Sequence, residues 1–131
     1  MAILNPVQKS CKYPDKNLCG SGVVFKLVQA LTKKIQNSPS TLLGATRLTV
    51  GWEKWLLDMV AIATISDMVP LVGENRLFAY YGLKVLRKSP RAGLQSLLTL
   101  VKIDQKNITE DDIGFMISPR INAASRMGKP E

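Results

Sequence analysis

Leu56-Leu-Asp-Met-Val-Ala-Ile-Ala-Thr-Ile-Ser-Asp-Met-Val-Pro-Leu71 is the stretch that decides the fold, an almost continuously apolar run that carries two carboxylates, Asp58 and Asp67. A segment that is apolar on every side is a buried helix or strand, and the length of this one favours a helix inside a core. Pro70 ends the run, because proline cannot donate to the helical ladder and pushes the preceding residue towards extended geometry. The sequence therefore predicts a buried helix whose last turn holds Asp67.

The two carboxylates of this run need separate explanations. Asp67 lies nine positions after Asp58, and nine steps of about 100° place them on opposite faces of a regular helix. Asp58 lies near the helix start, where the dipole favours a carboxylate and a salt bridge or cap suffices. Asp67 lies at the disfavoured end and, if buried, needs a cation, either an arginine or a divalent metal ion. Chemistry alone favours the arginine.

Length and composition indicate a globular chain. The 131 residues can form one ordinary domain or part of a larger one, and the 46% hydrophobic content is enough for a packed core. The apolar runs are too short to span a bilayer, and the first residues lack the basic start and apolar centre of a secretory signal. We therefore expect a cytoplasmic protein with no membrane partner.

The net charge and the cysteine and histidine content limit which partners and which catalytic mechanisms the chain can have. A net charge of +8 and a pI near 9.7 fit a polyanionic partner, although a solvated basic surface explains them equally well. Cys11 and Cys19 are too few for a disulfide scaffold, so we expect reduced thiols in or near the core. The chain has no histidine, which excludes Ser-His-Asp and Cys-His nucleophilic catalysis within it.

The remaining pattern is mainly helical. Residues 2–6 are typical of a short buried strand that ends at a turn. Apolar periodicity predicts helices over 20–35, 75–88, 90–101 and 109–118, and the last is expected to end before Pro119. The small residues Gly20-Ser-Gly22 either cradle a phosphate or allow close packing with Ser21 as a cap, and we favour the cap.

Several segments of the chain, taken in order, resemble the RecJ-type single-strand-specific DNA exonucleases of the DHH phosphoesterase superfamily. The similarity covers nearly the whole chain, and residues 36–51 lie clearly outside it. The segments are Ala2-Ile-Leu-Asn-Pro-x-Gln8, Cys11-x-Tyr-Pro14, Leu18-Cys-Gly-Ser-Gly-Val23, Leu57 to Leu71 of the central run, Gly73-Glu-Asn-Arg76, Tyr81-Gly-Leu-Lys-Val-Leu-Arg87 and Pro119-Arg-Ile-Asn-Ala-Ala-x-Arg-Met127.

This resemblance implies an α/β parent with a parallel sheet, whose active site holds two Mn²⁺ or Mg²⁺ ions with aspartates and an Asp-His-His motif. Residues 1–131 would be the C-terminal part of that DHH domain, leading towards the DHH-associated domain. By themselves they would be mainly α-helical, with one short N-terminal strand. Because the chain lacks Asp-His-His, we expect an internal piece that is inactive alone and that self-associates through exposed apolar surface.

The resemblance also assigns site residues. Asp67 matches the last metal-binding aspartate of the family, which reverses the chemical preference in favour of a catalytic metal. Arg120, Asn122 and Arg126 match a segment near the active-site cleft, so they are expected to contact phosphates of single-stranded DNA. The implied reaction is attack of metal-activated water on a phosphodiester, releasing nucleotides from the 5′ end. Ser125 stands where the family has glycine.

Two other hypotheses stay open. The parent could be another DHH phosphoesterase, acting on short oligonucleotides or cyclic dinucleotides. The chain could also be a non-catalytic helical module that binds nucleic acid through its basic face, in which case salt-dependent DNA binding would not respond to Asp67→Asn.

Overall fold

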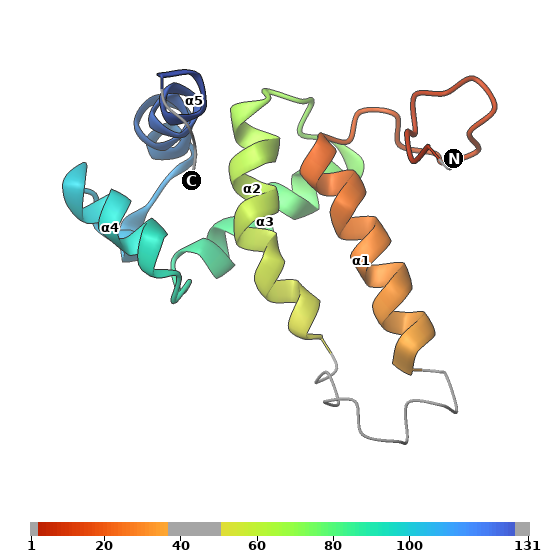
Figure 1. Ribbon diagram of the computed structural model, residues 1–131, viewed down its shortest axis with the longest axis horizontal. Coiled ribbons are helices and arrows are strands. Elements are labelled where there is room, and N and C mark those ends of the chain that lie inside the picture. Colours follow the sequence, from red (N-terminus) through yellow and green to blue (C-terminus); the bar gives the residue numbers. More distant parts are fainter. Residues whose placement is uncertain (1–2, 37–50, 128–131) are drawn as a thin grey trace.

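The computed structural model describes residues 3–36 and 51–127. Figure 1 shows α2 between α1 on one side and α4 and α5 on the other. The described residues form helices and no strand, so the mainly α-helical character is confirmed. The elements are α1 (Gly20–Gln36), the 3₁₀ helix η2 (Trp52–Leu56), α2 (Leu57–Ser66), α3 (Gly73–Leu86), α4 (Ala92–Leu100), the 3₁₀ helix η3 (Gln105–Asn107), the π-helix η4 (Asp112–Ile117) and α5 (Ser118–Met127).

The short strand expected over residues 2–6 is not formed in the part of it that the structure describes. Ile3 and Leu4 are 70% and 61% exposed, and the Asn5 side chain accepts a hydrogen bond of 2.9 Å from the Val7 N–H, which holds a turn. A strand needs a neighbouring strand to pair its backbone groups, and the described residues contain none.

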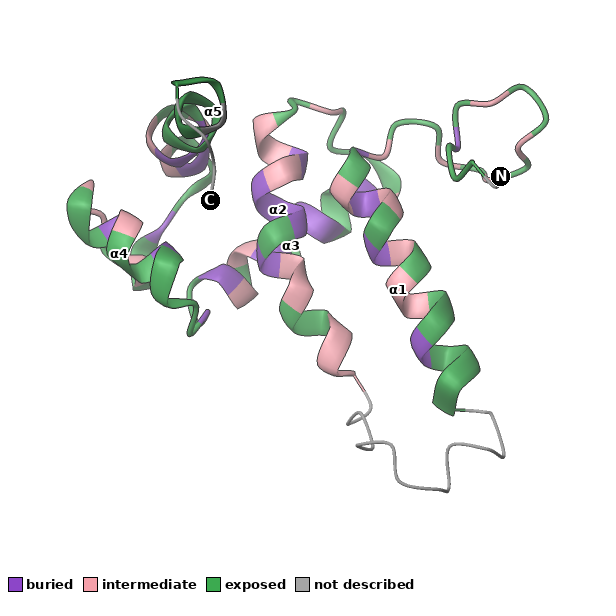
Figure 2. Cartoon of the chain, in the orientation of Figure 1, coloured by how far each residue is buried: buried purple, intermediate pink, exposed green. Residues whose placement is uncertain are grey.

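The predicted buried helix is α2, which forms the centre of the molecule. It packs against α1, α3 and η4, and Figure 2 shows buried residues gathered along it. Its contact with α3 is close, because a Cβ on Gly82 would lie 2.4 Å from the Cβ of Ala61 and 2.5 Å from the carbonyl oxygen of Leu57. The helix ends at Ser66, earlier than Pro70 predicts, and Met68 adopts a positive φ of 52°. Asp67 is therefore the C-cap residue of α2.

Two apolar clusters hold the helices together. The larger one joins α2, α3 and α4 to η4 and consists of Ile62, Leu86, Leu94, Leu98, Ile108, Ile113 and Ile117. The smaller one joins α1, α2 and α3 through Phe25, Val60 and Phe78, whose two rings meet edge to face with centroids 5.5 Å apart. The central run thus packs into both clusters, on opposite sides of α2.

The helix α1 does not bury the face that carries its apolar stripe, Val24, Leu27, Val28, Leu31 and Ile35, whose helical spacing predicts the helix. Phe25 and Thr32 are buried, whereas Val24, Leu27, Leu31 and Ile35 are exposed. The expected self-association through exposed apolar surface therefore has a candidate surface and stays a prediction.

The two cysteines are free, as expected, with Cys19 buried and Cys11 partly buried. Cys19 also corrects the expected cap of α1. Its Sγ accepts a hydrogen bond of 3.4 Å from the Gly22 N–H, and its carbonyl accepts one of 3.1 Å from the Val23 N–H. Ser21 lies inside the first turn instead of capping it.

The helical segment near the C-terminal end continues through Pro119, where the sequence predicts a break. The segment Thr109-Glu-Asp-Asp112 is typical of a capping box, and this is confirmed, because Asp112 accepts hydrogen bonds from the Thr109 N–H (2.9 Å) and hydroxyl (2.8 Å). The next turns are a π-helix, in which the Ser118 N–H bonds to the Ile113 carbonyl. This wider turn places Pro119 at the start of α5, where a missing N–H is tolerated.

Within residues 3–36 and 51–127, no helix has both the length and the apolarity needed to cross a membrane.

Candidate active site

The first end of α2 holds a buried and fully paired carboxylate. Asp58 is 1% exposed and accepts four hydrogen bonds, from Arg91 Nε (2.7 Å) and Nη2 (3.3 Å), from Ser89 Oγ (2.7 Å) and from the Met59 N–H (2.7 Å). The hydrogen bond to Asp58 raises the pKa of Arg91 above its ordinary value, against the opposing effect of burial. The expected structural salt bridge of Asp58 is confirmed.

The other end of α2 holds an exposed and unpaired carboxylate. The Asp67 N–H donates to the Ala63 carbonyl at 2.9 Å and completes the last turn. The side chain is exposed, so the premise that it is buried in the helix is wrong, because α2 ends at the surface. Among the described residues, the carboxylate has no hydrogen-bond or ion-pair partner. Water can hydrate it, so folding requires no cation there, and its oxygens are free for a ligand.

Asp67 lies at a cleft of about 580 Å³ that four segments of the chain enclose. The start of α1, one side of α2 with its C-cap, the segment from Arg91 into α4 and the first half of α5 all contribute to its wall. The lining residues are Ser21, Met59, Ile62, Ala63, Ser66, Asp67, Arg91, Gly93, Leu94, Leu97, Ser118, Ile121 and Asn122. The structure therefore brings Asp67 and Asn122, which are 55 positions apart in the sequence, to one cleft.

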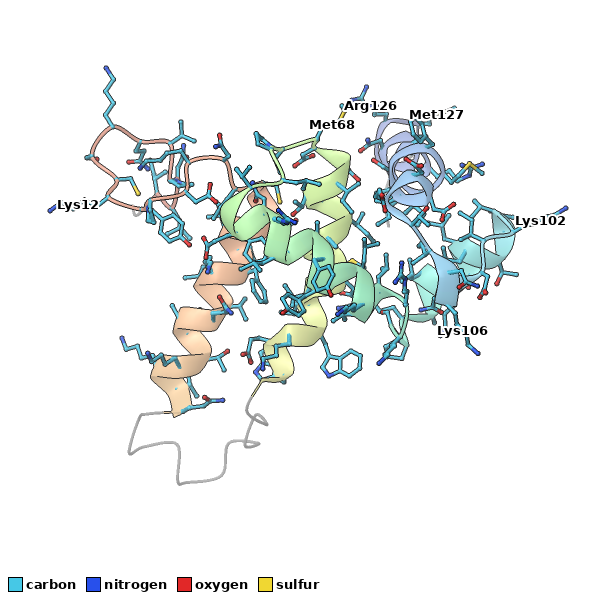
Figure 3. All side chains as sticks on the ribbon, turned by 180° about the vertical axis from the view of Figure 1, so that it is seen from behind. Lys12, Met68, Lys102, Lys106, Arg126 and Met127 are labelled. Carbon is cyan, nitrogen blue, oxygen red and sulfur yellow. The ribbon has the colours of Figure 1, made fainter. Side chains whose placement is uncertain are left out.

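Of the residues expected to contact phosphates, Asn122 and Arg126 lie on one face of α5. The segment is helical from Ser118 to Met127, so residues four apart share a face. Asn122 lines the cleft, and Arg126 extends the same face by one turn with an exposed side chain. Figure 3 shows Arg126 at the same edge of the molecule as Met68, the residue after Asp67.

Arg120 lies two positions from Asn122, which corresponds to about 200° around the helix and places it on the opposite face. Its Nη1 donates to the Met116 carbonyl at 2.6 Å, within the preceding π-helix. In this arrangement Arg120 helps to stabilise the turn that passes Pro119, and it does not line the cleft with Asp67.

Arg91 is a cleft residue whose role the sequence did not reveal. In the sequence it belongs to a basic cluster near the end of a helix, where positive charge complements the helix dipole. The cluster consists of Lys84, Arg87, Lys88 and Arg91. A buried acid 33 positions earlier gives no local signal. Asp58 fixes the guanidinium through Nε and Nη2, and Nη1 makes no hydrogen bond to the described residues. Arg91 thus offers a rigidly oriented donor beside the Asp67 cleft.

Ser66 is a second residue that the sequence did not single out. Its Oγ is buried and has no hydrogen-bond partner among the described residues, and the side chain borders the cleft next to Asp67. A buried hydroxyl without a partner is unusual.

The cleft can hold a cation beside an anion. A carboxylate oxygen is a typical ligand for Mg²⁺ or Mn²⁺, while Arg91 and the N-terminal ends of α1 and α4 favour negative charge. In the described ranges, no three acidic or cysteine side chains gather into a metal-binding group. Asp67 therefore supplies a single ligand at a cleft whose other polar groups suit a phosphate.

Comparison with known proteins shows which class of protein the chain is similar to. No family model matches the chain. Over nearly its whole length, however, the chain is similar to a segment of single-stranded-DNA-specific exonucleases.

The particular relatives are exonucleases named RecJ. The chain is 40% identical to RecJ of Bacillus subtilis over 126 residues, which are 96% of this chain and 14% of the relative. It is 34% identical to RecJ of Escherichia coli over 127 residues, with 96% and 22% covered, and 40% identical to RecJ of Haemophilus influenzae over 128 residues, with 96% and 21% covered. The chain thus spans 14 to 22% of the length of these relatives. The resemblance seen in the sequence motifs is confirmed.

Proposed function

We propose that the chain is a segment of a RecJ-like exonuclease that hydrolyses single-stranded DNA from the 5′ end, and that Asp67 binds a catalytic Mn²⁺ or Mg²⁺. One observation carries the proposal. The residue that matches the last metal-binding aspartate of the family is the unpaired carboxylate at the cleft that Asn122 also lines. The relatives that the chain resembles are named for activity on single-stranded DNA.

The environment of Asp67 fits a metal ligand. The carboxylate is exposed, lies beside a cleft and has no partner among the described side chains, so binding a cation breaks no existing interaction. A pair of divalent cations at such a site supplies activated water and offsets charge on the attacking and leaving oxygens. The ligands besides Asp67 are proposed to come from parts of the protein outside residues 1–131.

Asn122 and Arg126 are proposed to hold the phosphates of the strand. They follow one face of α5 outward from the cleft, and they can contact successive phosphates by hydrogen bonds and charge. Arg120 joins this role if its guanidinium releases the Met116 carbonyl, to which it is now bound. Arg91 orients a further donor at the cleft wall, because Asp58 fixes its guanidinium.

The isolated 131-residue chain is proposed to be inactive, because one metal ligand cannot assemble a two-metal site. The test uses protein expressed from the complete reading frame that encodes this sequence, with oligonucleotides labelled at the 5′ or the 3′ end, in Mn²⁺ and in EDTA. Release of short products from the 5′ end of single strands, lost in EDTA and in Asp67→Ala, is the expected result.

Three outcomes would contradict parts of the proposal. Activity of the isolated chain that is lost in Asp67→Ala would overturn its status as an incomplete segment. Preference for very short oligonucleotides or cyclic dinucleotides over long strands would indicate another phosphoesterase. Metal-independent DNA binding without cleavage by the complete protein would indicate a binding module.

A further inference from the structure

The exposed face of α3 carries an aromatic and basic stripe. Leu77, Tyr80, Tyr81 and Lys84 recur at helical spacing, and the first three are 55%, 55% and 51% exposed. Lys88 continues the stripe just beyond the helix. Exposed rings in a row are uncommon on a protein surface, because their burial is favourable. The stripe therefore needs an explanation other than packing within the described chain.

Lys84 and the two tyrosines form one unit. The tyrosine rings meet edge to face with centroids 5.1 Å apart. The Lys84 Nζ lies 4.1 Å from the Tyr80 ring centroid and 5.6 Å from that of Tyr81, and it donates a hydrogen bond of 2.8 Å to the Tyr80 hydroxyl. These contacts restrict the side chains, so the rings are held in place before any ligand binds.

Four residues of this stripe, Leu77, Tyr81, Lys84 and Lys88, form one wall of a groove of about 720 Å³ between α1, η2 and α3, and Tyr80 lies outside its lining. Trp55 of η2, which is 53% exposed, lines the groove together with Tyr81. The charged residues of the lining are four lysines, Lys26, Lys54, Lys84 and Lys88, and one acid, Glu74. Glu74 is already paired with Lys26 and bonded to the Tyr13 hydroxyl. The groove is thus basic, with unpaired lysines at Lys54 and Lys88 among the described contacts.

We propose that this groove binds single-stranded nucleic acid, with bases stacked on Trp55 and Tyr81 and the backbone phosphates near Lys54, Lys84 and Lys88. Non-specific single-strand sites combine aromatic platforms with a positively charged groove, because every base has a flat face and every nucleotide a phosphate. The lysines would also attract an acidic peptide, but its carboxylates do not stack on aromatic rings, whereas bases do. The rings therefore favour the nucleic acid.

The groove is separate from the Asp67 cleft. The two share no lining residue, and α2 contributes different sides to each of them. A strand held in the groove would be an additional anchoring point, away from the place where Asp67 lies. The inference rests on the proposed function for the choice of DNA as the probe, and DNA binding in the absence of metal is measured independently of cleavage.

The experiment uses the full 131-residue chain with Trp52→Phe, so that Trp55 is the single tryptophan. An oligothymidylate of about twelve nucleotides, a length within the site sizes of single-strand binders, is titrated in EDTA. We expect saturable quenching of Trp55 fluorescence, because a stacked base quenches indole emission, and affinity that falls with salt. An abasic oligomer of the same length and poly-glutamate are expected to give no quenching.

Substitutions separate stacking from charge. Trp55→Ala is expected to weaken binding about tenfold and Trp55→Phe to weaken it less, since the ring is retained. Because these two variants lack the tryptophan, binding by all variants is measured by the fluorescence anisotropy of a dye-labelled oligothymidylate. Each of Lys84→Gln and Lys88→Gln should reduce the slope of log affinity against log salt by about 0.7. Matched controls are Lys12→Gln and Lys106→Gln, which remove the same charge from exposed positions outside the groove (Figure 3).

Several results would overturn the inference. They are the absence of quenching, equal quenching by poly-glutamate, unchanged affinity in Trp55→Ala, and an equal loss of slope in the control variants. Circular dichroism of each variant checks that the fold is retained. If the complete protein fails to cleave DNA while the groove binds it, the proposed function fails and this inference stands. If the complete protein cleaves DNA while the groove does not bind it, the proposed function stands and this inference fails.

Discussion

The two ends of α2 place a carboxylate in opposite environments. Asp58 is buried, and it accepts four hydrogen bonds, two of which come from its salt-bridge partner Arg91. Asp67, nine positions later, is exposed, and its carboxylate has no partner among the described residues. A buried charge must be compensated by other groups of the fold, whereas water can hydrate an exposed charge until a ligand binds. The comparison indicates that Asp58 serves stability and that Asp67 is available for function.

The largest expected effect is on stability, and it separates these two ends directly. Asp58→Ala leaves Arg91 and the buried Ser89 hydroxyl without their acceptor, so we expect a loss of about 3 kcal/mol in the free energy of unfolding. Asp67→Ala should change it by less than about 0.5 kcal/mol, because the side chain is exposed and unpaired. Urea denaturation followed by circular dichroism measures both, and equal losses would contradict the comparison.

A second substitution tests the packing that holds the Asp58 end in place. Gly82→Ala puts a methyl group 2.4 Å from the Cβ of Ala61, so α2 and α3 must separate at a cost of about 2 kcal/mol. Gly93→Ala is the matched control, since a Cβ there meets no atom within 4 Å, and it should stabilise α4 by about 0.5 kcal/mol. Thermal unfolding of both variants gives the two values, and a neutral Gly82→Ala would mean that the helices are less closely packed than described.

A smaller effect is expected from removing one donor to Asp58 while keeping the others. Ser89→Ala deletes the hydroxyl at 2.7 Å from Asp58 Oδ2 but leaves the Arg91 and Met59 contacts. We expect a loss of about 1 kcal/mol in urea denaturation, the typical net value of a hydrogen bond. A loss as large as that of Asp58→Ala would show that the hydroxyl, and not the arginine, dominates the network.

The smallest effect concerns Glu74, whose carboxylate is intermediate between the other two in exposure. Burial acts to raise the pKa of Glu74, but hydrogen bonds from Lys26 and Tyr13 outweigh it, so the pKa lies below the ordinary value of 4.5. Folding therefore favours the ionised form. The resulting stability is present above the ordinary pKa and is lost as the pH falls through the lower folded-state pKa.

We accordingly expect Glu74→Gln to lower the free energy of unfolding by a few tenths of a kcal/mol at pH 7, as is typical of partly exposed ion pairs. The difference from the unsubstituted chain should shrink towards zero in acid. Urea denaturation at pH 7 and at about pH 3 checks this, and a difference that grows in acid would contradict the assigned direction.

The sequence predicts the helices well because their signals are local. Apolar spacing gives α1 and α3, and the Thr109–Asp112 pair gives the start of the last helical segment. The continuation past Pro119 was missed, because the π-helix that accommodates the proline depends on packing of Ile113 and Ile117 in the core. The outward face of α1 was missed for a similar reason, since periodicity does not say which face another element covers.

The candidate site was partly predictable. Helical geometry separated Asp58 from Asp67, and motif similarity singled out Asp67 and Asn122, which the structure places at one cleft. The argument that Asp67 is buried was wrong, because an apolar run does not show where its helix reaches the surface. The pairing of Asp58 with Arg91 spans 33 positions, so the sequence alone could not reveal it.

The most direct test of the division between the two carboxylates compares Asp67→Asn with Asp58→Asn in protein from the complete reading frame. For each variant, Mn²⁺-dependent cleavage of single-stranded DNA and the melting temperature are measured together. We predict that Asp67→Asn loses on the order of a hundredfold or more in cleavage rate at an unchanged melting temperature, while Asp58→Asn lowers the melting temperature and, while folded, loses far less of its rate, through the weaker orientation of Arg91. Full cleavage by a stable Asp67→Asn protein would contradict the account.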